Sequence, residues 1–295
     1  MRISSAMQYS TYDADINSAQ NKLYTAQQQE STGLAINNPS DNPAGAEQVI
    51  NMNGVESQLN QYQSNLSQAK DILNSTSTAL TGAGSIMQSA YQIALSASSG
   101  TNSASSEANM AQQITTLQQQ LTAAGNTTGP NGEYLFAGQK TSTQPFSASS
   151  GSLVYSGDSG SIQIAGGPTD SLTVNVPGSP LFTNAYNQLE TLKTDIQSGN
   201  VSNISTDLGG LQSAQTAFTD ASGTMGSTAD SVASLTTANT SRITDLQSDI
   251  SNLTNVNIAN AVTNYTSAQS AYQAALEVVG QASTSLSLVN YISGQ

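Results

Sequence analysis

Apolar side chains recur at steps of three and four residues from Val55 to Ala94, a periodicity sustained for about six heptads. The series is Val55, Leu59, Tyr62, Leu66, Ala69, Leu73, Thr76, Leu80, Ala83, Met87, Ala90 and Ala94, and a second series, Ile72, Ala79, Ile86 and Ile93, widens the stripe. A stripe of this length predicts a long helix in a bundle or coiled coil. Gly82 and Gly84 weaken it locally.

The same spacing continues towards both ends of the chain. It predicts a first helix that includes Tyr12 to Ala26 and stops at Gly33. The Asn- and Pro-rich stretch that follows favours a new helix, capped by Asp41 or Asn42 and opened by Pro43. Further helices are predicted around residues 110–124, 185–196, 204–218, 232–253 and 258–289.

The central part of the chain has a different pattern. Short segments of alternating polarity at 153–155, 161–164 and 171–176 predict strands, and turns are predicted at 157–160 and 166–168. We therefore expect a mainly α protein with a small β insertion. Its N- and C-terminal halves should form one long antiparallel helical bundle or coiled coil, with the β domain at the tip. The expected parts are a terminal coiled-coil domain (1–38 and 256–295), a helical body (39–140 and 183–255) and the insertion (141–182).

Composition excludes several classes of function. Charged residues make up 8% of the chain, against about 25% in ordinary domains. A net charge of -13 disfavours binding to nucleic acid or to an anionic membrane surface. With neither histidine nor cysteine, the chain lacks a Ser-His-Asp triad, a thiol nucleophile and the usual zinc ligands. We expect no catalytic, cofactor-binding or metal residues and no enzymatic activity.

The sequence predicts neither a membrane-spanning segment nor a signal peptide. No stretch approaches about 18 consecutive apolar residues, so no membrane insertion is expected. The first 20 residues contain Tyr9, Tyr12, Asp13 and Asp15, and the apolar core of a signal peptide is missing there.

The two terminal helices are rich in Ala, Tyr and Gln, so a pair of them alone would bury little apolar surface. We expect them to be loose in an isolated molecule and to become ordered on assembly. Tyr265 and Tyr272, seven residues apart, suit either ordinary coiled-coil packing or a seam buried between molecules. The candidate assembly residues are Ile3, Tyr12, Ile16, Leu23, Tyr265, Tyr272, Leu276, Val279, Leu286 and Val289.

Several motifs resemble those of the bacterial flagellin family. The start at residues 1–5, the Ser31–Asn37 and Pro39–Ala44 segments, Asn257–Ala259 and Leu286–Val289 resemble the family's terminal regions. The central Asn131–Gly138 segment resembles the hook-associated members, as does the stretch from Gly151 to Phe182. The motif residues are Gly132, Tyr134, Leu135, Phe136, Gly138, Thr141, Pro145 and Phe146. The chain departs from the family at Leu34 and Ala35, usually basic, and at Asn42, Asn255 and Asn257, usually acidic.

The resemblance implies a structural protein outside the cell, exported without a cleaved signal peptide by the flagellar type III system. It implies a homo-oligomeric ring with the first hook-associated protein on the hook side and flagellin on the filament side. A cytoplasmic export chaperone would bind the C-terminal helix. The alternatives are the flagellin filament subunit itself and, in another class, a needle-tip or translocator protein of a type III secretion system. A translocator would need a long apolar segment that inserts into a membrane, and the sequence has none.

Overall fold

The computed structural model describes residues 5–149 and 151–293, with side chains at 7–149 and 151–282. The described part contains α1 (Ser5–Thr32), α2 (Pro43–Ala97), α3 (Ala104–Gly125), β1 (Phe146–Ser149), β2 (Ser152–Tyr155), β3 (Gln163–Ala165), β4 (Ser171–Thr173), α4 (Leu181–Gln197), α5 (Val201–Thr254) and α6 (Ile258–Ser293). It forms two compact units, a terminal unit (Met1–Ser57 and Ile243–Gln295) and a body unit (Gln58–Arg242). The expected three-part division of the chain, with its boundaries, stays a prediction.

Helix α2 begins where the sequence predicts. The Oδ1 atom of Asn42 accepts a hydrogen bond from the Gly45 amide at 3.0 Å, and Pro43 is the first helical residue. Asn42 is therefore the N-cap. The helix runs for 55 residues and passes through Gly82 and Gly84 without a break, because buried side chains on both sides of them hold it against the body core.

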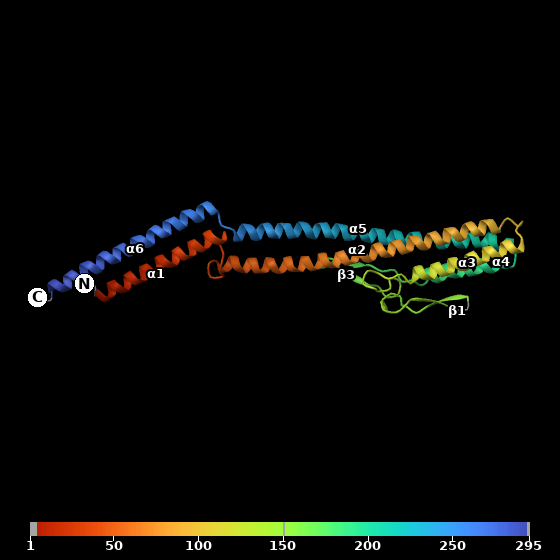
Figure 1. Ribbon diagram of the computed structural model, residues 1–295, viewed down its shortest axis with the longest axis horizontal. Coiled ribbons are helices and arrows are strands. Elements are labelled where there is room, and N and C mark those ends of the chain that lie inside the picture. The colour runs from red at the N-terminus through yellow and green to blue at the C-terminus, as the bar shows by residue number, and fades with distance from the viewer. Residues whose placement is uncertain (1–4, 150, 294–295) are drawn as a thin grey trace. The chain divides into compact units, whose positions relative to one another are not determined.

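In the terminal unit, α1 and α6 lie side by side and antiparallel (Figure 1). They are joined to α2 and α5 by short connections at residues 33–42 and 255–257. The start of α1 and the end of α6 lie at the same end of this pair.

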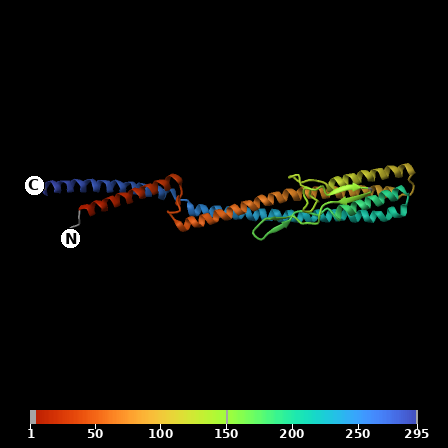
Figure 2. The same ribbon diagram turned by 90° about the horizontal axis from the view of Figure 1, so that it is seen from below.

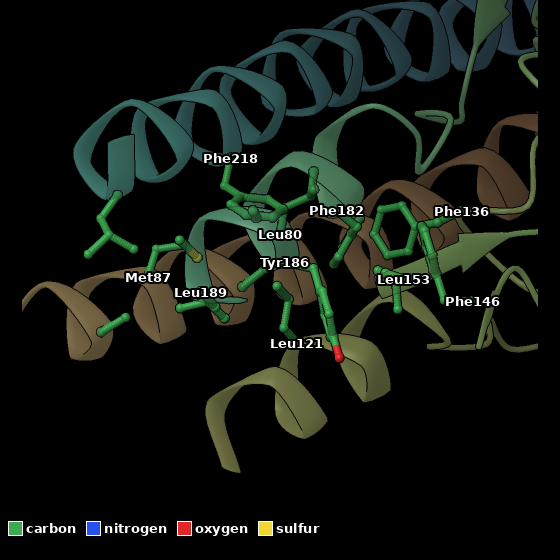
Figure 3. Close-up of a cluster of buried hydrophobic side chains, with 14 of the residues drawn as sticks. Leu80, Met87, Leu121, Phe136, Phe146, Leu153, Phe182, Tyr186, Leu189 and Phe218 are labelled. Atoms are coloured by element: carbon green, nitrogen blue, oxygen red, sulfur yellow. The ribbon is translucent and has the colours of Figure 1, made fainter. Parts of the chain in front are cut away.

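In the body unit, α3 and α4 pack against each other and against the body portions of α2 and α5 (Figures 1 and 2). The core is built from buried side chains of all four helices and of the β region. Its largest fully buried members include Phe136, Phe146, Phe182 and Phe218, which Figure 3 shows beside Leu80, Met87 and Leu189. The predicted mainly α fold with a small β insertion is confirmed.

Helix α5 is longer than the sequence suggests. Two helices were expected around 204–218 and 232–253, whereas one helix spans 54 residues. Gly223 and Gly226 lie in the intervening stretch. Nothing lies within 4 Å of the position of a Cβ atom on either of them, so no close contact requires glycine there. Phe218, Met225 and Val232, each seven residues apart, are buried and hold this stretch to the core. Tertiary packing thus overrides the low helix propensity of glycine.

The strands form two separate antiparallel hairpins, β1–β2 and β3–β4. Strand β1, which pairs Phe146 with Tyr155, was not predicted from the sequence. Strand β4 ends at Thr173, earlier than predicted, because Asn175 turns inwards: its side chain accepts from the Ile162 amide at 2.7 Å and donates to the Gly160 carbonyl at 2.9 Å. The hairpins lie on the flank of the body and not at the tip, where the sequence predicted them, since α3 leads back along the bundle before the insertion begins.

The β3–β4 hairpin is fastened to both long helices of the body. The Asn65 amide on α2 donates to the Ala165 carbonyl at 3.1 Å, and the buried Asn239 amide on α5 donates to the Gly166 carbonyl at 2.9 Å. Leu66 and Leu235 close against Gly166, where a Cβ atom would come within 3.0 Å of both side chains. The insertion is therefore placed by specific contacts with the helices.

Candidate assembly surface

The terminal unit has almost no core of its own. Among the side chains that the structure describes there, the buried apolar ones are three alanines, Ala26, Ala46 and Ala261. The body unit, in contrast, buries four phenylalanines and many leucines completely. Alanine burial contributes little apolar area, so packing within one molecule stabilises the terminal unit weakly.

The candidate assembly residues with described side chains lie mostly on the seam between α1 and α6. Six of them are half-buried there: Tyr12, Ile16 and Leu23 on α1, and Tyr265, Tyr272 and Val279 on α6. They contribute to contact between the two helices of one molecule, and a role between molecules stays a prediction. Ile3 lies outside the described residues, and so do the side chains of Leu286 and Val289.

A second set of apolar side chains in the terminal unit faces outwards. Of twelve large hydrophobic side chains exposed in the described part, nine lie in this unit: Met7, Tyr9, Tyr24, Ile50, Val55, Ile258, Val262, Leu276 and Val278. Tyr24 is 66% exposed and Met7 64%. We call these nine residues the exposed apolar set. Leu276 belongs to the predicted assembly residues, whereas the other eight do not. One of these eight, Val55, belongs to the apolar series of residues 55–94 and is nevertheless exposed.

A shallow groove of about 860 Å³ follows the α1–α6 pair. Small and polar side chains line it, among them Ala14, Ser18, Asn21, Ala268 and Ala271. Small side chains such as these let another helix approach closely, whereas Lys22 and Gln29 in the same lining are larger.

Main-chain hydrogen bonds join the connection between α1 and α2 to the connection between α5 and α6. The Ala35 amide donates to the Thr254 carbonyl at 2.6 Å, and the Val256 amide donates to the Gly33 carbonyl at 2.9 Å. The Asp41 carboxylate accepts from the amides of Asn37 and Asn38 at 3.0 and 2.8 Å. This bend is thus closed by main-chain hydrogen bonds and by the Asp41 carboxylate.

The family motif lies in the body and is mostly structural in its contacts. Leu135, Phe136, Gly138, Pro145 and Phe146 are buried. The ring centroid of Phe182 lies 4.8 Å from that of Phe136, 5.3 Å from that of Phe146 and 5.1 Å from that of Phe218. These four rings form a continuous aromatic cluster that joins the insertion to α4 and α5 (Figure 3). The remaining motif residues, Gly132, Tyr134 and Thr141, belong to a turn in which the Tyr134 amide donates to the Thr141 carbonyl at 2.8 Å.

Polar contacts of the motif fix one edge of the insertion. The Tyr155 hydroxyl lies 3.0 Å from the Phe136 carbonyl and 2.7 Å from the Asp158 carbonyl, and burial raises the pKa of Tyr155. The amides of Gln139 and Gly160 donate to the Asp158 carboxylate and hold the pKa of Asp158 below its usual range. The Gly-Asp-Ser-Gly stretch at 157–160 therefore forms a turn stabilised by its own aspartate.

The described residues contain neither a metal site of the usual ligands nor a membrane-spanning helix. No group of three or more His, Cys, Asp or Glu residues there is placed to hold a metal ion. No helix in that part of the chain is long and apolar enough to cross a membrane.

Comparison with known proteins finds a family that resembles the N-terminal part of this chain. Residues 3–141 match the family model of the bacterial flagellin N-terminal helical region. The matched stretch covers α1, α2, α3 and most of the motif region. The resemblance to the flagellin family is thereby confirmed.

A second similarity is to hook-associated proteins. The chain is 27% identical over 182 residues to flagellar hook-associated protein 3 of Escherichia coli, an alignment that covers 62% of this chain and 57% of that protein. The chain thus matches little more than half of the length of this relative.

Solved structures of hook-associated proteins share the fold. The first, from Vibrio parahaemolyticus and named as a flagellar hook-associated protein, has a TM-score of 0.68 and 19% identity, with 73% of this chain and 100% of that one covered. Flagellar hook-associated protein 3 from Legionella pneumophila has a TM-score of 0.64 and 14% identity, covering 68% and 98%. Bacillus cereus FlgL has a TM-score of 0.60 and 18% identity, covering 68% and 99%.

Proposed function

We propose that the protein is a structural, non-enzymatic component of the bacterial flagellum, which forms the ring at the junction between hook and filament. The observation that carries this proposal is the sequence similarity to Escherichia coli flagellar hook-associated protein 3. The shared fold of the solved hook-associated proteins is consistent with it.

The proposed mechanism is mechanical. The terminal unit buries three alanines but exposes nine large apolar side chains, so neighbouring copies supply the packing that one molecule lacks. Burying a side chain such as Tyr24 or Leu276 completely contributes about 1.5–3 kcal/mol. Several such contacts per molecule, repeated around a ring, would make a rigid connection out of weakly packed helix pairs.

The proposed partners follow from the same role. Copies of the protein itself form the ring, the first hook-associated protein lies on the hook side, and flagellin lies on the filament side. We further propose export through the flagellar type III channel, with a cytoplasmic chaperone on α6 before assembly. Covering the exposed apolar residues of α6, such as Val262 and Val278, would protect the chain from aggregation.

A deletion in the organism that encodes the chain tests the role. Cells without the protein are expected to complete their hooks, to release flagellin into the medium and to lack filaments. The full chain should restore filaments when supplied from a plasmid. Normal filaments in the deletion strain would refute the proposal.

Point variants test the assembly surface. Tyr24→Ser and Leu276→Ser, combined, should abolish restoration of filaments while the helical content of the purified protein is unchanged. Val154→Ser is the matched control, because Val154 is exposed to a similar degree as Leu276 but lies in the body unit. Equal motility with the combined variant and with the control would contradict the proposed surface.

The second candidate function is that of the filament subunit, which the match to the flagellin N-terminal region favours. The two roles differ in self-assembly. A filament subunit should form long polymers from purified monomer in a kosmotropic salt, whereas a junction protein should need the end of a partner assembly. Electron microscopy of the salt-treated protein distinguishes them.

A further inference from the structure

The corner of the body where α4 passes into α5 contains a pair of carboxyl groups. Asp195 lies near the end of α4, and Asp207 lies in the second turn of α5. The Asn203 amide nitrogen on α5 donates to Asp195 Oδ1 at 3.1 Å. Because Asn203 and Asp207 are four residues apart on one helix face, this contact brings the Asp207 carboxyl to the side of α5 that faces Asp195.

Asp207 is deeply buried for a charged residue. Its exposed fraction is 7%, and its Oδ2 atom is buried without a hydrogen-bond partner. Ile204 and Leu211 on the same helix are buried beside it. An ionised carboxylate in such surroundings loses hydration that no donor replaces, which makes ionisation costly.

Among the described residues, no cation is one of the groups that act on the Asp207 carboxyl. Besides Asp195, the charged residues of α4 are Glu190 and Lys193, which pair with each other. On α3 the Glu107 carboxylate lies beside Gly199 at the corner and adds negative charge, whereas α2 has no charged residue after Asp71. The charged side chains that the packed helices bring towards the corner are therefore either carboxylates or members of an ion pair.

We infer that this corner is a proton-binding site, in which one proton is shared between the carboxyl groups of Asp195 and Asp207. Two close carboxyl groups avoid the repulsion of a double charge when one of them keeps its proton and donates it to the other. Burial first, and then the Asp195 charge and a hydrogen bond with it, raise the pKa of Asp207 to about 6.

The site makes the stability of the body depend on pH. The folded chain keeps its proton up to about pH 6, whereas an unfolded aspartate releases it near 3.8. The stabilisation from the shared proton is fully present below pH 3.8 and is lost as the pH rises towards and through about 6. The folded body is thus more stable in mildly acidic than in neutral solution.

The test compares urea unfolding of the full chain with that of Asp207→Asn from about pH 4.5 to about pH 7.5. Relative to the variant, the unfolding equilibrium constant of the wild type should rise by about tenfold to a hundredfold over this range. Asp220→Asn, at an exposed position on the same helix, is the control and should follow the wild-type profile. Parallel profiles of wild type and Asp207→Asn would overturn the inference.

A direct titration keeps the inference testable if Asp207→Asn does not fold. Carbon-13 NMR of the wild-type carboxyl groups should show one aspartate that titrates near pH 6, and Asp195→Asn should lower its midpoint. The absence of such a signal, or an unchanged midpoint in Asp195→Asn, would refute a shared proton. Stabilisation by added Ca²⁺ that disappears in Asp207→Asn would refute it too, because it would identify a cation site.

Discussion

Two glycines of the family motif allow backbone strain and steric room to be separated. Gly138 and Gly132 both adopt positive φ, 70° and 78°, so alanine at either position costs about 1–2 kcal/mol in backbone conformation. Their surroundings differ. A Cβ atom on Gly138 would overlap with the carboxylate and carbonyl oxygens of Asp158, whereas nothing lies within 4 Å of a Cβ atom on Gly132.

Gly138→Ala should therefore lose stability twice, from strain and from overpacking. Overpacking adds about 1–3 kcal/mol, and the total is about 2–5 kcal/mol, against about 1–2 kcal/mol for Gly132→Ala. Urea unfolding monitored by far-ultraviolet circular dichroism measures the difference between the two variants. Near-ultraviolet circular dichroism of the tyrosines should change in Gly138→Ala, since the Tyr155 hydroxyl contacts the Asp158 carbonyl. Equal losses in the two variants would show that the close approach to Asp158 is not what requires glycine at 138.

Three further predictions concern the body core, a helix cap and acid stability. Phe182→Ala removes the ring at the centre of the aromatic cluster and should cost about 3–5 kcal/mol in urea unfolding. Tyr24→Ala, at a 66% exposed side chain, should change stability by less than about 0.5 kcal/mol, and a similar loss from both would contradict the described burial. Asn42→Ala should cost about 1 kcal/mol, and Asn42→Asp, which keeps the capping oxygen, should cost much less. The pKa of Asp158 is held down by backbone amides, so this carboxylate contributes stability that is lost as the pH falls below its ordinary pKa. Acid unfolding curves of Asp158→Asn should lack that component, and curves of unchanged shape would argue against it.

The helical architecture was largely predictable because the spacing of apolar side chains that produces it repeats along the sequence. Steps of three and four residues predict α2 whatever the distant packing is, and Asn42 before Pro43 predicts its start. Helix α5 was wrongly predicted as two helices, around 204–218 and 232–253. The buried side chains of Phe218 and Val232, which maintain the helix, depend on contacts with other elements.

The contacts of the candidate sites were less predictable than the helices. The Phe146–Ser149 strand has four residues, of which only Phe146 is buried, and the aromatic cluster joins rings from segments far apart in sequence. In the sequence Asp207 resembles any helix-surface carboxylate, and its burial is evident only in the folded chain. The outward position of Tyr24 could have been suspected from an aromatic residue next to the stripe residue Leu23.

The bend of the terminal unit has a consequence for how such a chain tolerates change. Its two closing hydrogen bonds, from Ala35 to Thr254 and from Val256 to Gly33, use main-chain atoms alone. Every amino acid except proline supplies the same donor, so the side chains of Ala35 and Val256 can change over evolutionary time while the joint persists, whereas Gly33 has a φ of 71° that favours glycine. Conservation of geometry without conservation of residues is what such a hinge permits, and proline is the substitution that selection should remove there.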